Sequence, residues 1–184
     1  MNHLLFLSLL HNILNNENIN IVVIATRHDS HAIQVISSLN AGKHVFVEKP
    51  LAKTSDECRE LVQVAKQRNR TLFVGHVFLH ASPVLKLREM IDDGALGAIN
   101  YISSRRLNLG PVRKDVSALY DLGPHDISMM LYLLGQKPLS VACSGFDRLN
   151  PGIHDVCNLT MTFEGNRIGM VHVSWLDPRK ERVL

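Results

Sequence analysis

The sequence predicts an α/β chain, in which a partial doubly wound parallel sheet is followed by an α+β domain with an antiparallel sheet. An unbroken apolar run, residues 21–25, whose first four residues are β-branched, is typical of a strand that is buried on both faces. Two further strand-like segments, residues 44–47 and 71–75, alternate with helical stretches, which is the order of βαβ units. Three later strand-like segments follow one another without helices, which indicates antiparallel pairing.

The helices of the first half have local start and stop signals. Gly42 follows the helical stretch after the first strand and supplies a left-handed cap. Thr54 and Glu57 form a capping box at the start of the next helix, because each side chain can reach the other's backbone N–H. Apolar residues at helical spacing follow this box, so a helix is expected from there.

The second half begins with Ser82-Pro83, where proline at the first helical position starts a helix that stops at Gly94. Gly123-Pro124 is expected to open another helix, which Gly135 ends. The other expected elements are a strand over residues 99–107, a loop over 108–120 and strands over 139–146, 156–163 and 167–175, the last two joined by a hairpin turn at 164–166.

Composition excludes several classes of protein. The chain has 184 residues, of which 46% are hydrophobic and 20% charged, so it is not disordered as a whole. A net charge of +3 is no nucleic-acid signature, and no apolar run approaches the ~20 residues of a membrane span. Three cysteines without a C-x-x-C pair argue against a disulfide framework and a thiolate zinc site, and indicate a cytoplasmic protein.

Two candidate site segments follow the first two predicted strands. Ala25-Thr26 closes the first strand, and Glu48-Lys49-Pro50 closes the second. Ligands of open parallel sheets bind beyond the carboxyl ends of the strands, so these residues are candidates for ligand contact. The alternative is an ordinary surface turn.

A third candidate is the run Asp121-Leu122-Gly123-Pro124-His125, which spaces Asp and His four residues apart. With a helix opening at Gly123-Pro124, His125 lies in its first turn, where a helix N-terminus lowers the pKa of a histidine. A neutral imidazole there could take a proton from a hydroxyl. The alternative is a capping motif with a partly buried histidine. Metal binding by Asp121, His125 and Asp126 is weakly supported, so no metal site is predicted.

Taken together, these segments resemble the glucose–fructose oxidoreductase/inositol dehydrogenase (Gfo/Idh/MocA) family over roughly residues 12–184. The resemblance rests on Ala25-Thr26 with His31, on A-G-K-H-V followed by E-K-P at 41–50, on Val74-Gly75-His76, and on D-x-G-x-H at 121–125. It implies two domains: an incomplete dinucleotide-binding, Rossmann-like domain over 1–76 and a substrate and oligomerisation domain over 77–184.

The resemblance also implies roles for single residues. Lys49 would contact the reacting hydroxyl and the nicotinamide region, with Glu48 beside the nicotinamide ribose. Asp121 and His125 would bind substrate and transfer a proton. Further cofactor contacts are expected from Ala25, Thr26, His31 and His76.

The implied reaction is hydride transfer between a sugar, cyclitol or related hydroxyl and NAD or NADP. Arg105, Arg106 and Asn108, near Arg113 and Lys114, are candidate substrate-binding residues, because cations near a sugar site could meet a phosphate or carboxylate. The alternative is a solvated basic face. A homo-oligomer formed through the antiparallel sheet is the expected partner arrangement, with no nucleic acid and no membrane.

The sequence departs from the family in one large respect. The G-x-G-x-x-G turn that holds the pyrophosphate occurs nowhere in the chain. We therefore expect that the first βαβ unit is missing and that the C-terminal end is cut. An alternative function follows, in which the chain is a catalytically inactive fragment that keeps the fold and acts at most as a binding or assembly module.

Overall fold

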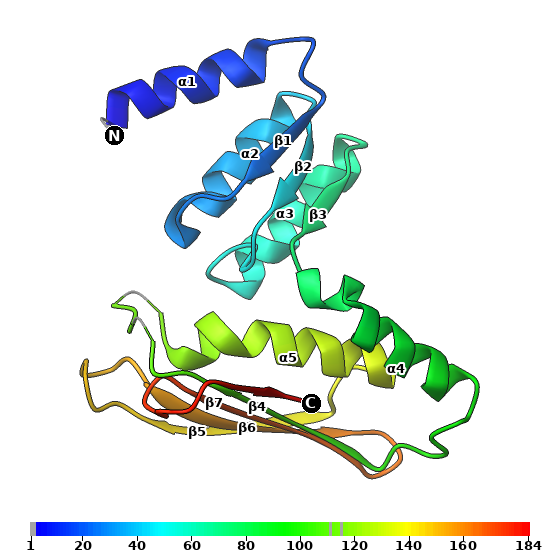
Figure 1. Cartoon of the computed structure of the whole chain (residues 1–184). Coiled ribbons are helices and arrows are strands. Elements are labelled where there is room, and N and C mark those ends of the chain that lie inside the picture. The colour runs from blue at the N-terminus through cyan, green and yellow to red at the C-terminus, as the bar shows by residue number, and fades with distance from the viewer. Residues whose placement is uncertain (1–2, 111, 115) are drawn as a thin grey trace. The chain divides into compact units, whose positions relative to one another are not determined.

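The computed structural model describes residues 3–110, 112–114 and 116–184. The chain divides into two compact units, Met1–Gly75 and His76–Leu184, which are called the first and the second unit below. Each unit has its own sheet and its own buried core (Figure 1).

The first unit is a three-stranded parallel sheet with helices. In chain order its elements are α1 (His3–Asn15), β1 (Ile21–Ile24), η1 (His28–Ser30), α2 (His31–Asn40), β2 (His44–Val47), α3 (Ser55–Gln67) and β3 (Leu72–Val74). The strands lie in the order β1-β2-β3, and both pairs are parallel. This confirms the predicted parallel sheet and its alternating helices.

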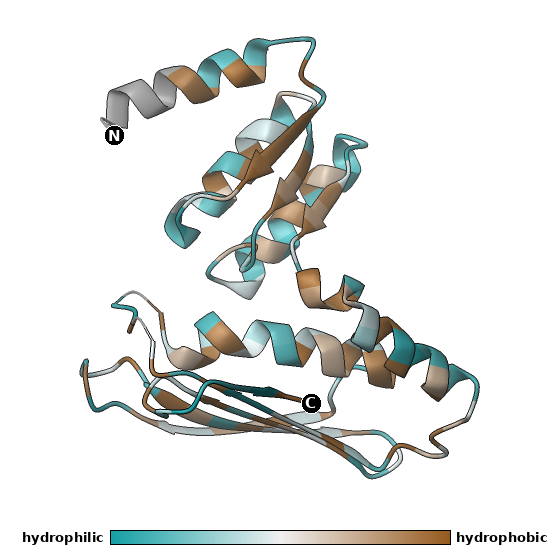
Figure 2. Cartoon of the chain, in the orientation of Figure 1, coloured by the Kyte–Doolittle hydropathy of each residue, from teal (hydrophilic) through white to brown (hydrophobic). Residues whose placement is uncertain are grey.

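Only one face of this sheet is buried. Val22 and Ile24 of β1 pack into a core with Leu39 of α2, whereas Ile21 and Val23 are 62% and 67% exposed. The prediction that the first strand is buried on both faces is therefore wrong, because no layer covers its second face in the described residues. Figure 2 shows how hydrophobic this strand is.

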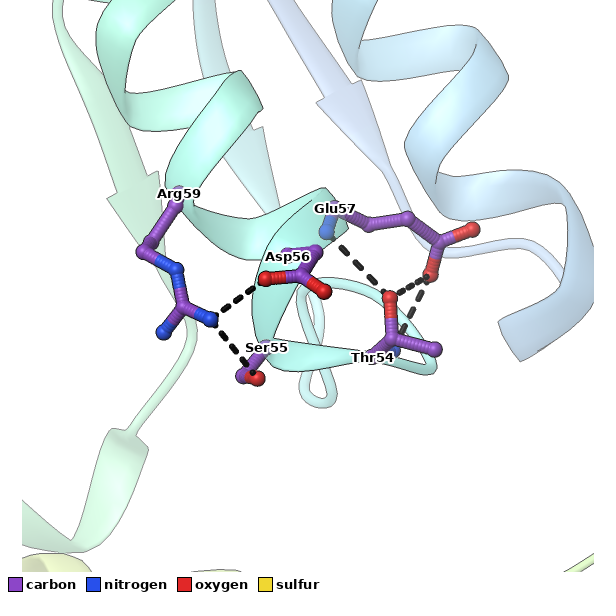
Figure 3. A network of polar contacts seen from close by, with 5 residues as sticks. All are labelled: Thr54, Ser55, Asp56, Glu57 and Arg59. Carbon is purple, nitrogen blue, oxygen red and sulfur yellow. Dashed lines mark hydrogen bonds and ion pairs between the residues drawn. The ribbon is translucent and has the colours of Figure 1, made fainter.

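The predicted capping box of α3 is present. The Thr54 hydroxyl accepts the backbone N–H of Glu57 at 3.2 Å, and the Glu57 carboxylate accepts the Thr54 N–H at 3.0 Å. Arg59 adds contacts to Ser55 and Asp56 in the same turn (Figure 3). Two donors that the helix leaves unpaired are thus satisfied, which explains why the helix begins here.

The second unit is a five-stranded sheet with helices. Its elements are η2 (Val77–His80), α4 (Ser82–Asp92), β4 (Tyr101–Leu107), α5 (Ala118–Leu134), β5 (Ser140–Phe146), β6 (Val156–Phe163), β7 (Arg167–Ser174) and β8 (Glu181–Val183). The strand order is β5-β6-β7-β4-β8. Pairs β5–β6, β6–β7 and β4–β8 are antiparallel, but β4–β7 is parallel. The expected α+β domain with antiparallel strand pairing is confirmed, and the one parallel pair makes the sheet mixed.

One face of the mixed sheet packs on α5. Met130 of α5, Phe163 of β6 and Val173 of β7 are buried in one cluster with Trp175, which follows β7. Residues of β6 and β7 alternate between this cluster and the other, open face.

Helix α5 begins earlier than the sequence predicted. Its N-cap is Ser117, whose hydroxyl accepts the Tyr120 N–H, so Pro124 lies inside the helix. Asp121 consequently occupies the first turn, and His125 lies about two turns into the helix. The expectation that His125 lies in the first turn of the helix is therefore wrong. Asp121 occupies that first turn instead.

Candidate functional site

The first unit gathers candidate residues at one edge of its sheet. Because β1, β2 and β3 are parallel, their carboxyl ends meet at the same edge. Ala25 and Thr26 follow β1 there and are exposed, while Glu48 and Lys49 follow β2 and are half-buried. The pairing continues into this edge, since the Glu48 N–H donates to the Ile24 carbonyl at 2.9 Å. The structure thus brings these four residues to one edge.

His31 does not reach the surface of this edge. Its ring is fully buried, with Nδ1 2.7 Å from the Pro50 carbonyl oxygen and Nε2 3.1 Å from the Thr26 carbonyl oxygen. A buried ring that faces two backbone carbonyls has no surface left for a ligand. This corrects the predicted cofactor contact of His31: its ring links the Thr26 turn to the loop after Lys49.

The Thr26 turn is held from α2 as well. The Thr26 hydroxyl donates to Gln34 Oε1 at 3.1 Å and lies 2.9 Å from the Ser30 hydroxyl. Gln34 is itself buried, so its amide gives the turn a rigid support. The turn after β1 is therefore organised by the helix that follows it.

Gly75 follows β3 at the same edge, and it has no side chain that would contact Glu48. A Cβ at Gly75 would lie 3.2 Å from both Glu48 Oε1 and Phe46 Cζ, which is tighter than ordinary contact. The absence of a side chain at Gly75 thus lets the Glu48 carboxylate lie against the backbone after β3. His76, the next predicted residue, is the first residue of the second unit.

In the second unit, Asp121 and His125 lie four residues apart on α5 and share one face of the helix. The Asp121 carboxylate has one hydrogen-bond donor and one ion-pair partner. The indole Nε1 of Trp175 donates to Asp121 Oδ2 at 3.4 Å, and Arg113 Nε lies 3.8 Å from Oδ1. Asp121 also lies in the first turn of α5.

His125 packs against an aromatic ring from a different element. The ring of Phe78 in η2 lies edge-to-face with the imidazole, with 4.7 Å between centroids and 63° between planes. Both rings are half-buried. This contact limits the orientations that the His125 ring can take.

The three candidate substrate residues at the end of β4 do not form one group. Arg105 is exposed and pairs with Glu181 of β8 at 2.6 Å. Arg106 points to the opposite face and is buried against Asp126, because successive side chains alternate along a strand. The prediction that Arg106 contacts substrate is corrected by this burial. Asn108 is half-buried, and its N–H donates to the Ser174 carbonyl at 3.0 Å.

Sequence reasoning missed three residues that support the candidate site. Trp175 contacts Asp121 from the end of β7, and no local signal linked two residues so far apart. Phe78 contacts His125 from η2, again without a local signal. Asp126 was considered only as a weak metal ligand, and no local signal indicated that it pairs with Arg106 of β4.

No group of three or more His, Cys, Asp or Glu side chains in the described part of the chain could hold a metal ion. Within the same residues, no helix has both the length and the apolar character needed to cross a membrane.

Comparison with known proteins places the chain in a family. Residues 2–76 match a family model described as an oxidoreductase family with an NAD-binding Rossmann fold, and residues 84–183 match the GFO/IDH/MocA C-terminal domain. The chain belongs to the GFO/IDH/MocA oxidoreductase family. The resemblance inferred from the E-K-P and D-x-G-x-H segments is thereby confirmed.

Named members of the family are similar to this chain. Inositol 2-dehydrogenase of Salmonella typhimurium is 31% identical over 130 residues, which cover 68% of this chain and 38% of that protein. The uncharacterized oxidoreductase YdgJ of Escherichia coli is 33% identical over 147 residues, covering 75% of this chain and 42% of its own length. The chain thus spans less than half the length of these relatives.

Solved structures of other oxidoreductases share the fold. An inositol dehydrogenase homolog of Azotobacter vinelandii, solved with NADH and myo-inositol, matches with a TM-score of 0.87 at 24% identity. The match covers 96% of this chain and 50% of that one. An oxidoreductase of Pseudomonas syringae matches with a TM-score of 0.84 at 26% identity, with the same coverage of both chains.

Proposed function

We propose that this chain is part of an NAD(P)-dependent oxidoreductase that transfers a hydride between a sugar or cyclitol hydroxyl carbon and a nicotinamide cofactor. The observation that carries the proposal is the shared face of Asp121 and His125 on α5, where a carboxylate and an imidazole lie one helical turn apart. The E-K-P segment at the edge of the first unit supports it, since it supplies a lysine and a carboxylate. The named relatives that act on inositol suggest the cyclitol class.

The residues at the edge of the first unit fit one part of a nicotinamide dinucleotide. The Glu48 carboxylate, which lies against the Gly75 backbone, can accept hydrogen bonds from ribose hydroxyls. Ala25 presents a small side chain, and Thr26 next to it presents a hydroxyl. A pyrophosphate would need the backbone N–H groups of a glycine-rich turn, and the sequence has none. When bound, the cofactor would supply the hydride acceptor.

The chain's own residues would handle the proton and the charge. As the hydride leaves the carbinol carbon, the hydroxyl becomes a carbonyl and must lose its proton. His125 would accept that proton at a ring nitrogen. The family resemblance implies that Lys49 contacts the reacting hydroxyl, where an ammonium would stabilise the negative charge that develops on the oxygen. Asp121, held by Trp175 and Arg113, would bind a substrate hydroxyl and orient it toward His125.

We also propose a cytoplasmic homo-oligomer that associates through the open face of the mixed sheet. Tyr101, Ile168 and Met170 expose apolar surface on that face. The three cysteines are all free, as a reducing compartment would keep them.

The test begins with a fluorescence titration of NADH and NADPH into the 184-residue chain, followed by turnover with myo-inositol and a panel of sugars. Saturable binding would mean that the residues present still form a nucleotide site, and turnover would mean that they also complete the chemistry. His125→Gln should lower kcat by about 10²- to 10⁴-fold, which is the usual contribution of a general base. His154→Gln, at an exposed histidine outside the site, is the matched control and should keep full activity.

Two results would contradict the proposal in different ways. Binding without turnover on any substrate would favour the alternative of an inactive binding module. Unchanged kcat in His125→Gln or in Lys49→Met would remove that residue from the mechanism, with Lys53→Met as the control for the lysine.

A further inference from the structure

A buried ion pair lies beneath the candidate proton-transfer residue in the second unit. Arg106 of β4 donates to Asp126 of α5 through two hydrogen bonds, Nε to Oδ2 at 2.7 Å and Nη2 to Oδ1 at 3.2 Å. The two side chains are 6% and 2% exposed. A bidentate pair of this kind holds the planar guanidinium in one orientation.

The oriented guanidinium in turn contacts Phe78. Its central carbon lies 4.7 Å from the centroid of the Phe78 ring, which is the distance of a cation–π contact. The same ring packs edge-to-face on His125, also at 4.7 Å. A continuous series of contacts therefore runs from Asp126 through Arg106 and Phe78 to the His125 imidazole.

Four side chains from three elements make this series. Phe78 comes from η2, Arg106 from β4, and Asp126 and His125 from α5. Asp126 and His125 are neighbours in the helix and point in directions about 100° apart, so they are linked through the other two side chains rather than directly. A shift of Arg106 would free the Phe78 ring, and a free ring would leave the imidazole with more rotamers.

We propose that Arg106, held by Asp126, is a positioning residue for His125 and acts through Phe78. The inference rests on the proposed function, in which His125 accepts the proton of the substrate hydroxyl. Arg106 was a candidate substrate ligand in the sequence, and the structure gives it this different role. The paired carboxylate compensates the guanidinium charge, so the pair orients the ring without adding a net charge beside the imidazole.

A purely structural ion pair is the competing explanation, and one double variant separates the two. Removing one partner leaves a buried charge and can unfold the unit, whereas replacing both by apolar side chains is often neutral for stability. Arg106→Met/Asp126→Leu should therefore fold, while it removes the cation from the Phe78 ring. Arg88→Met is the matched control, because Arg88 also pairs with an acid and lies over a ring, that of Tyr132 at 5.8 Å.

The first readout is NMR and needs no turnover. In the wild-type chain we expect nuclear Overhauser effects between the Phe78 and His125 ring protons, assigned with His125→Gln. The double variant should lose them while its urea unfolding midpoint stays at the wild-type value, and Arg88→Met should keep them.

The second readout is kinetic. A misplaced base lowers kcat by about 10²-fold without weakening substrate binding, so kcat should fall in the double variant while KM stays constant. Phe78→Leu should show the same split, and Phe78→Tyr, which keeps the ring, should restore kcat.

Each outcome decides one of the two proposals. Ring contacts that persist in a stable double variant, or that are missing in the wild type, overturn the positioning role whether or not the chain turns over. Lost ring contacts with unchanged kcat also overturn it. A wild-type chain that shows the contacts but is inactive on every substrate refutes the proposed function and leaves the positioning of the ring established by NMR.

Discussion

The capping box of α3 offers a stability test that does not depend on function (Figure 3). Thr54→Ala removes a hydroxyl that accepts the Glu57 N–H at 3.2 Å and donates to Glu57 Oε2 at 3.1 Å. The Thr54 and Lys53 N–H groups still donate to that carboxylate, at 3.0 and 3.1 Å. Only the hydroxyl half of the box is lost, so we expect a cost of about 1 kcal/mol.

Glu57→Ala removes the other half. It deletes the acceptor of both N–H groups and a negative charge in the first turn, where the helix dipole stabilises it by about 0.3–1 kcal/mol. The double variant should cost less than the two single variants together, because both side chains serve one reciprocal contact.

The assay is urea unfolding followed by circular dichroism, with a thermal scan as a second measure. For a unit of this size, about 1 kcal/mol lowers the melting temperature by about 4–8 °C. Thr54→Ser is the control, since it keeps the hydroxyl and should stay close to the wild type. Strict additivity of Thr54→Ala and Glu57→Ala would refute the reciprocal box, and so would a Thr54→Ser loss as large as that of Thr54→Ala.

Three further predictions concern other contacts. Trp175→Phe removes the indole donor to Asp121, so the KM for substrate should rise more than kcat falls in steady-state kinetics. His31→Ala frees the Thr26 turn and should weaken NADH binding in a fluorescence titration, whereas His11→Ala, at an exposed histidine, should not. Burial raises the pKa of the Cys157 thiol above its ordinary value of 9.0, so iodoacetamide should modify the exposed Cys143 first, and urea should remove the difference in peptide mass spectrometry. Because the native thiol keeps its proton longer than the unfolded one, this raised pKa lowers stability as the pH rises past 9.0.

Local signals predicted the first unit well. The apolar run at 21–25 and the Thr54–Glu57 box act within a few residues of the chain, so their consequences are visible in the sequence. What the run did not reveal is that only one face of β1 is covered, because burial depends on layers from elsewhere in the chain.

The start of α5 shows two local signals in competition. Pro124 favours the first turn of a helix, and Ser117 favours a cap. Ser117 forms the cap, since Ala118 packs fully buried against the sheet and the earlier turn is stabilised by that burial. The burial of Ala118 depends on the sheet, so the residues around Pro124 alone do not reveal it.

The sequence motifs of the candidate site were predictable, but the side chains that contact these motif residues were not. Lys49, Asp121 and His125 stand out by spacing, whereas the burial of Arg106 and the contact of Trp175 with Asp121 depend on strands that pair across long stretches of chain. The sequence offered a basic cluster near residue 106, but which face of β4 each arginine takes depends on the register of the sheet.

The parallel pairing of β4 with β7 has a consequence for synthesis on the ribosome. Both neighbours of β4 in the sheet, β7 and β8, come later in the chain, and β7 begins about 60 residues after β4 ends. At about 5–20 residues per second, β4 waits roughly 3–12 s with both edges unpaired. The first unit completes its own sheet before β4 emerges, so the nascent chain should carry one folded half beside an open strand that is the natural target of a holding chaperone.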